Sequence, residues 1–112
     1  MSRTITRTHF QKEVIDNRHL SLVHFKTEWS GACHIIKPVY EELCDSYKDV
    51  ADFFSIDVEQ EAGVDKELGI REIPTILFFR DGQVVDHVIG LIPKKTLITK
   101  IEQALITRKQ IF

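Results

Sequence analysis

Trp29-Ser30-Gly31-Ala32-Cys33 is the stretch on which the fold of this chain depends. On its N-terminal side, residues 20–25 form a run that is apolar on both faces, which is typical of a central strand covered on both sides. On its C-terminal side, apolar residues recur at helical spacing from about residue 32 to residue 47. The stretch is therefore predicted to be a turn between a strand and a helix.

Outward from this turn, strand and helix patterns alternate along the chain. The clearest is a hairpin, because Asp81-Gly82 separates two apolar runs and is a typical two-residue turn. The alternation ends in this hairpin and a last helix, which indicates a mixed sheet between helices. The expected elements are a strand at 4–7, a helix from a capping box at Thr8 to near Asn17, strands at 20–25 and 50–58, helices at 32–47 and 61–69, strands at 75–80 and 83–89, and a helix from Pro93.

Size and composition bound the class of protein. The length of 112 residues fits one domain, 1–112, with a single core. A hydrophobic content of 43% with a net charge of -2 disfavours disorder and a nucleic-acid partner. No apolar run approaches the roughly 18 residues of a membrane span, and the first residues lack the apolar stretch of a signal peptide. Two cysteines make no disulfide framework, so we expect a soluble cytoplasmic protein without membrane partners.

Four features together resemble the thioredoxin family over nearly the whole chain. They are the Trp29 to Cys33 loop followed five residues later by Pro38, Ile73-Pro74-Thr75 before a strand, the Asp81-Gly82 hairpin, and Val88-Ile89-Gly90 before the last helix. The resemblance implies an α/β thioredoxin fold, with a central mixed sheet of about five strands and helices on both faces. It also implies a cis peptide before Pro74, no cofactor, and a shallow groove for an extended substrate peptide around Trp29, Gly31, Ala32, Ile73, Pro74 and Gly90.

The departures from the family pattern lie at the centre of this site. Ser30 replaces the attacking cysteine, Ala32 the usual proline, His24 a buried acid, and Phe53 a neighbouring lysine. A reversible dithiol switch needs one sulfur to attack the substrate and a second to resolve the mixed disulfide, and a hydroxyl does neither at neutral pH. Both natural divergence and an engineered Cys-to-Ser exchange give this loop, and the other departures favour divergence.

Ser30 and Cys33 each have a structural and a chemical interpretation. Serine is a preferred helix N-cap, so Ser30 is predicted to accept a hydrogen bond from the amide of Cys33. Cys33 lies in the first helical turn, where the amides and the helix dipole favour a thiolate. It is either a thiol that exchanges with substrates or small thiols, or an inert, half-buried remnant.

His24 interrupts an otherwise apolar strand and needs a hydrogen-bond partner if it is buried. In the family the equivalent side chain lies beneath the second cysteine, so one hypothesis is that His24 acts as a base or ion-pair partner for Cys33. The alternative is a core histidine bonded to backbone or water. His34 is predicted to be an exposed helix residue, and no metal site is expected because the ligand spacing is wrong. Cys44 lies about 16 Å along the same helix and is assigned to the core.

Two classes of function remain open. In the first, the protein belongs to thiol-disulfide redox homeostasis and works through Cys33 alone, with weak or no classical disulfide reductase activity. Its partners would be proteins with thiols or disulfides, or low-molecular-weight thiols, and a homodimer stays open. In the second, it is a non-catalytic module that binds peptides in the groove beside Pro74.

Overall fold

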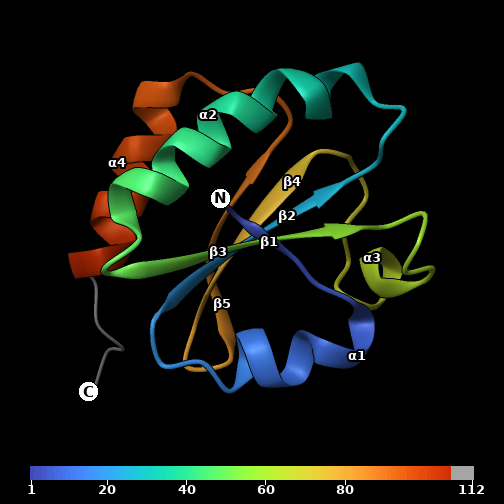
Figure 1. Cartoon of the computed structure of the whole chain (residues 1–112), viewed down its shortest axis with the longest axis horizontal. Coiled ribbons are helices and arrows are strands. Elements are labelled where there is room, and N and C mark those ends of the chain that lie inside the picture. The colour runs from blue at the N-terminus through green and yellow to red at the C-terminus, as the bar shows by residue number, and fades with distance from the viewer. Residues whose placement is uncertain (107–112) are drawn as a thin grey trace.

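The computed structural model describes residues 1–106, so the last six positions of the domain expected over 1–112 lie outside the described residues. The elements alternate along the chain as the sequence pattern predicts (Figure 1). They are β1 (Arg3–Thr4), α1 (Arg7–Phe10), a π-helical turn η1 (Gln11–Ile15), β2 (Leu20–Lys26), α2 (Gly31–Tyr47), β3 (Ala51–Asp57), α3 (Val64–Glu67), β4 (Thr75–Arg80), β5 (Gln83–Ile89) and α4 (Lys94–Ile106).

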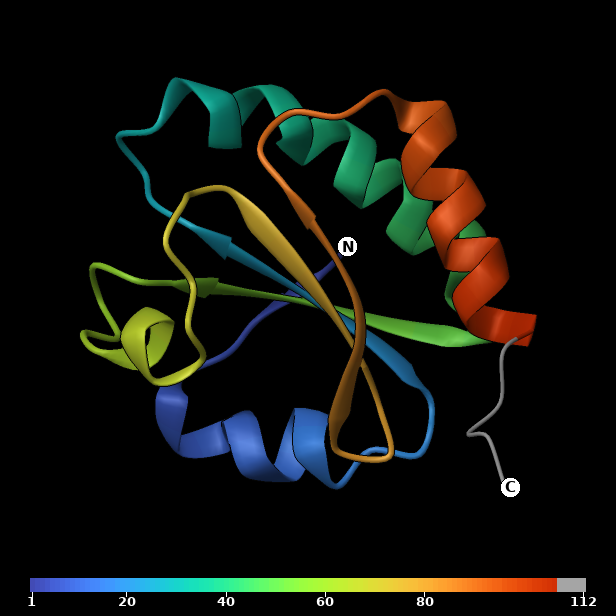
Figure 2. The ribbon, with the colours of Figure 1, turned by 180° about the vertical axis from the view of Figure 1, so that it is seen from behind.

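The five strands form one mixed sheet in the order β1-β3-β2-β4-β5. β3 pairs in parallel with β1 and β2, whereas β4 pairs antiparallel with β2 and β5. Helices α2 and α4 cover one face, and α1 and α3 lie on the other, as the front and back views show (Figures 1 and 2). The predicted mixed sheet with helices on both faces is confirmed.

β2 is the middle strand and contributes to two hydrophobic cores. Side chains alternate between the two faces of a strand. Leu20 and Leu22 pack in the cluster that includes α2 and α4, whereas Val23 and Phe25 pack in the cluster that includes residues near α1 and α3. His24 shares the face of Leu22, so its imidazole lies under α2. The end of β2 and the start of α2 therefore bring the candidate site to the edge of the first core.

The hairpin follows the prediction, because Asp81 and Gly82 both adopt positive φ, 53° and 77°. Two such residues match the mirror-image turn that suits the twist of paired strands. β5 leads from this turn back to Gly90, whose φ of 75° ends the strand beside Pro74. Within residues 1–106, no helix has the length and apolarity that crossing a membrane requires.

Two predicted boundaries near the N-terminus are wrong. The first strand is Arg3–Thr4 rather than 4–7, and the helix begins at Arg7 without a capping box at Thr8. Its first amide, that of Arg7, donates instead to a carboxylate oxygen of Glu61 at 2.8 Å. This cap comes from a residue 54 positions away, so the local sequence could not reveal it. The helix expected at 61–69 is also shorter, Val64–Glu67.

Candidate active site

Ser30 is the N-cap of α2. Its backbone is extended, with φ -83° and ψ 119°, and its hydroxyl oxygen accepts a hydrogen bond from the amide of Cys33 at 3.3 Å. The predicted cap is therefore confirmed. The carbonyl of Ser30 also accepts from the amide of His34 at 3.3 Å, which completes the first turn. Gly31 is exposed and has no atom near the position of a Cβ, and Ala32 is half-buried.

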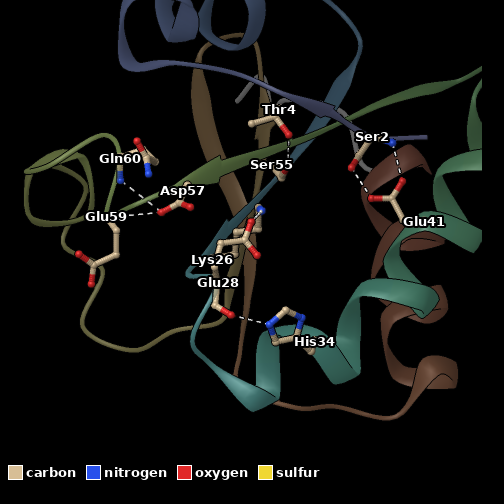
Figure 3. A network of polar contacts seen from close by, with 10 residues as sticks. All are labelled: Ser2, Thr4, Lys26, Glu28, His34, Glu41, Ser55, Asp57, Glu59 and Gln60. Atoms are coloured by element: carbon tan, nitrogen blue, oxygen red, sulfur yellow. Dashed lines mark hydrogen bonds and ion pairs between the residues drawn. The ribbon is translucent and has the colours of Figure 1, made fainter.

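His34 is exposed, as predicted, and its ring also bonds back to the loop that precedes α2. Its Nε2–H donates to the carbonyl oxygen of Glu28, a contact that spans the whole stretch before the helix (Figure 3). The Glu28 carboxylate in turn pairs with Lys26 at 3.1 Å. The sequence pattern missed this bond, because an exposed helix position carries no signal of a partner six residues away.

Cys33 and Cys44 are both free thiols on α2. Cys33 has only 3% of its surface exposed and points away from solvent at the first turn. Cys44 is 7% exposed and packs in the cluster between α2, α4 and the sheet, which confirms its assignment to the core. Burial raises the pKa of the Cys44 thiol. Cys44 is therefore held in the protonated, less reactive form.

His24 is buried with 2% of its surface exposed, and its ring lies 5.2 Å from the ring of Tyr40. Its Nε2 has no hydrogen-bond partner, so a pair with Cys33 is not formed through this atom. Burial, and next the charge of Lys26, lower the pKa of His24 from 6.5 to about 4. The imidazole is therefore neutral at pH 7.

Tyr40 fixes the position of α2 above the sheet. Its fully buried hydroxyl lies 3.0 Å from the carbonyl oxygen of Leu22 and 2.6 Å from that of Phe54, on neighbouring strands. Burial raises the pKa of Tyr40 well above its usual range, so the hydroxyl stays a donor. Phe53, which stands where the family often has a lysine, packs edge-on against Tyr40 at 5.3 Å. The helical pattern predicted Tyr40 as apolar core and missed this polar link.

The backbone around Pro74 lies at the end of the hairpin. The peptide bond between Ile73 and Pro74 is cis, and the Pro74 carbonyl accepts a hydrogen bond from Gly90 at 2.8 Å. The hydroxyl of Thr75 donates to the Glu72 carbonyl at 2.6 Å, on the other side of the same segment. Pro74 is buried and Ile73 half-buried, and this segment lies directly before β4 and is joined to the end of β5 through Gly90.

Trp29 presents most of its ring to solvent, with 74% of its surface exposed. Its indole Nε1–H donates to Glu59 at 2.9 Å. Glu59 is held by the turn after β3, where Asp57 Oδ1 accepts from the amides of Glu59 at 2.8 Å and Gln60 at 3.3 Å (Figure 3). Glu59 and Asp57 were not predicted as site residues, since they are distant in sequence from Trp29.

The family of the chain follows from its match to the thioredoxin family model, which covers residues 1–103. The chain belongs to the thioredoxin family. It is similar to Thioredoxin 1 of Synechococcus elongatus, with 33% identity over 94% of this chain and 98% of the relative. The Griffithsia pacifica protein named Thioredoxin is 37% identical to this chain over 88% of this chain and 90% of its own length.

A solved structure gives the same family. The crystal structure of Malassezia sympodialis thioredoxin (Mala s 13) is similar to this chain with a TM-score of 0.84 and 30% identity, covering 94% of this chain and 91% of that chain. In this chain, the Trp29 to Cys33 stretch leads into α2, and Pro74 follows a cis peptide bond. Among residues 1–106, no group of three or more His, Cys, Asp or Glu side chains is placed to hold a metal ion.

Proposed function

We propose that this thioredoxin-family protein exchanges disulfides through the single thiol of Cys33. The observation that carries the proposal is the position of Cys33, a free thiol in the first turn of α2 with a serine cap where a second sulfur would stand. Cys44 cannot replace the missing sulfur, because it lies eleven residues further along the same helix, about 16 Å away.

The proposed step is a balanced thiol-disulfide exchange. The Cys33 thiol gives up its proton, and its sulfur attacks one sulfur of a substrate disulfide. A new disulfide forms between Cys33 and that sulfur, while the old bond breaks and the other sulfur leaves as a thiolate. Since Ser30 cannot attack this mixed disulfide, it persists until an external thiol resolves it. We therefore expect weak or no classical disulfide reductase activity.

His24 is proposed as the group that receives the proton of Cys33. Its burial under α2, its unpartnered Nε2 and its neutral form at pH 7 support this role. An imidazole with a pKa of about 4 holds a proton only weakly, so we expect a modest contribution. If Cys33 alkylation by iodoacetamide is unchanged across pH 6 to 9 after His24→Gln, the role is wrong.

The substrates are proposed to be proteins with thiols or disulfides, and low-molecular-weight thiols. The surface that would hold an extended peptide consists of Trp29, Gly31, Ala32, Ile73, Pro74 and Gly90. The exposed ring of Trp29 supports this assignment. Two free cysteines support a reducing compartment, and we propose the cytoplasm.

The test is incubation with oxidised glutathione, followed by mass spectrometry of the intact protein and its peptides. We expect one glutathionyl group on the peptide with Cys33, no adduct in Cys33→Ser, and an unchanged adduct in Cys44→Ser. Insulin reduction, assayed in parallel, should stay near background. An unmodified Cys33 would contradict the proposal and leave a peptide-binding module, and efficient insulin reduction would contradict the single-thiol mechanism. A non-reducing gel of the same samples tests for a disulfide-linked homodimer.

A further inference from the structure

Cys33 is closed off in the structure, although the proposed exchange needs direct contact between two sulfurs. Only 3% of its surface is exposed. A substrate disulfide must approach the attacking sulfur in line with the bond that breaks, which a buried side chain does not allow. The first turn of α2 must therefore move before Cys33 can react.

Besides the helical backbone bonds of α2, three hydrogen bonds made by Ser30 and His34 hold this turn. Ser30 Oγ accepts from the amide of Cys33, and the Ser30 carbonyl accepts from the amide of His34, each at 3.3 Å. The third joins the His34 ring to the Glu28 carbonyl. Gly31 adds no side-chain packing, because nothing lies within 4 Å of its Cβ position. The two bonds to Ser30 are long and the His34 ring is exposed, and such bonds at the end of a helix are the kind that opens first in a local fluctuation.

Pro38 separates the first turn from the rest of α2. Proline has no amide hydrogen, so the carbonyl of His34 lacks the helical donor four residues later. The rest of the helix is anchored, because Ile36 just before Pro38 and Tyr40 and Leu43 after it are all buried in the core under α2 and α4. One backbone hydrogen bond between the first turn and the rest of α2 is therefore missing. The first turn can open while the rest of the helix stays packed on the sheet.

We infer that Cys33 reacts only when the first turn of α2 opens, and that the Ser30 hydroxyl is a positioning residue that sets how often this happens. In the closed turn the hydroxyl holds the amide of Cys33 itself, so the cap and the thiol are released together. Ser30, which stands in place of the attacking cysteine, then controls access to the sulfur of Cys33. This inference rests on the proposed function, because it concerns the same thiol.

The test is the rate of iodoacetamide alkylation, measured separately for Cys33 and Cys44 by peptide mass spectrometry. When opening is fast relative to the chemistry, this rate is proportional to the fraction of molecules that are open. Ser30→Ala removes the cap and should raise the rate at Cys33 about two- to thirtyfold. Ser30→Thr keeps a hydroxyl and should restore the rate to within about threefold of the original.

Gly31→Ala provides a variant that is not expected to impair folding. A Cβ has space at this position, and alanine favours the helix over glycine, so the rate at Cys33 should fall about two- to fivefold. Cys44, on the anchored part of the same helix, is the internal control, and its rate should change by less than about twofold in every variant. Circular dichroism verifies that each variant is folded.

Two results would overturn the inference. One is a rate at Cys33 that does not respond to Ser30→Ala. The other is an equal change at Cys33 and Cys44, which would mean that access comes from global unfolding. Alkylation does not require disulfide exchange, so these results are independent of the glutathione experiment. If no mixed disulfide forms, the inference that the turn opens still stands. If the alkylation rates contradict the opening of the turn, the proposed disulfide exchange still stands.

Discussion

The two cysteines of α2 have almost the same burial, 3% for Cys33 and 7% for Cys44, yet their surroundings differ. Cys33 lies in the first turn of α2, where its amide bonds to the Ser30 hydroxyl at 3.3 Å. Cys44 packs on the anchored part of the helix, and burial raises the pKa of its thiol. The degree of burial therefore does not by itself decide whether a thiol can react with a reagent or substrate. The contacts that would have to break decide it.

The largest expected effect is on disulfide reductase activity, when a second cysteine is placed three residues before Cys33 or, as a control, before Cys44. Ser30→Cys recreates a cysteine pair three residues apart at the first turn of α2, and we expect insulin reduction to rise from background to sustained turnover. Glu41→Cys places a cysteine at the same spacing before Cys44 and serves as the control. It should remain inactive, because the anchored helix does not open to substrate. Equal activity of the two variants would remove the distinction between the two ends.

The pH dependence of stability tests the imidazole of His24, which is buried beside Tyr40 of α2. The pKa of His24 is lowered to about 4 in the folded protein, against 6.5 unfolded, so the unfolded state binds the extra proton in between. The contribution to stability is present in full above pH 6.5 and is lost as the pH falls to about 4, by about 3 kcal/mol. Urea unfolding of His24→Gln should lack this part of the slope. An unchanged slope would mean that His24 does not titrate in this range.

Removing the hydroxyl of Tyr40 tests the anchor between the two cysteines. Tyr40→Phe leaves two buried carbonyls, of Leu22 and Phe54, without this donor, and it should lower the free energy of unfolding by about 1 to 3 kcal/mol. Tyr47→Phe is the matched control. Its hydroxyl bonds to Glu102 at the surface, so its loss should cost less than about 1 kcal/mol. Similar losses in urea unfolding would contradict the assignment of Tyr40 as the anchor.

The smallest effect is expected from the contact that holds Trp29. Glu59→Ala removes the acceptor of the indole Nε1–H on an exposed ring, so the free energy of unfolding should change by less than about 1 kcal/mol. Trp29 is the only tryptophan, and its fluorescence emission should nevertheless shift as the ring loses its position. Alkylation of Cys44 should not change, because this contact lies at the other end of α2. An unaltered emission spectrum would show that Glu59 does not position the ring.

Features with a local sequence signal could be predicted, and features made by distant residues could not. The Ser30 cap and the Asp81-Gly82 turn are set by neighbours within three residues, and both are observed as predicted. The start of α1 was misplaced because its first amide bonds to Glu61, across the fold. The hold on Trp29 by Glu59 was missed for the same reason.

His24 combines one feature that the sequence predicted with another that only the structure shows. Its place on an apolar strand indicated burial, which the structure confirms, but not that Nε2 would lack a partner. The lowered pKa of His24 also required the structure, because burial is its main cause and the charge of Lys26 on the same strand only adds to it.

Residue order alone was sufficient for the mixed sheet, the family resemblance and the loss of the attacking sulfur, because each depends on residue type and short spacing along one chain. Only the tertiary structure decided how Cys33 is enclosed, since that depends on the helix, the loop before it and the strand beneath it at once. The Trp29 to Cys33 stretch thus specifies a capped turn with one thiol. The packing of α2 on the sheet determines that the thiol is closed off until the turn opens.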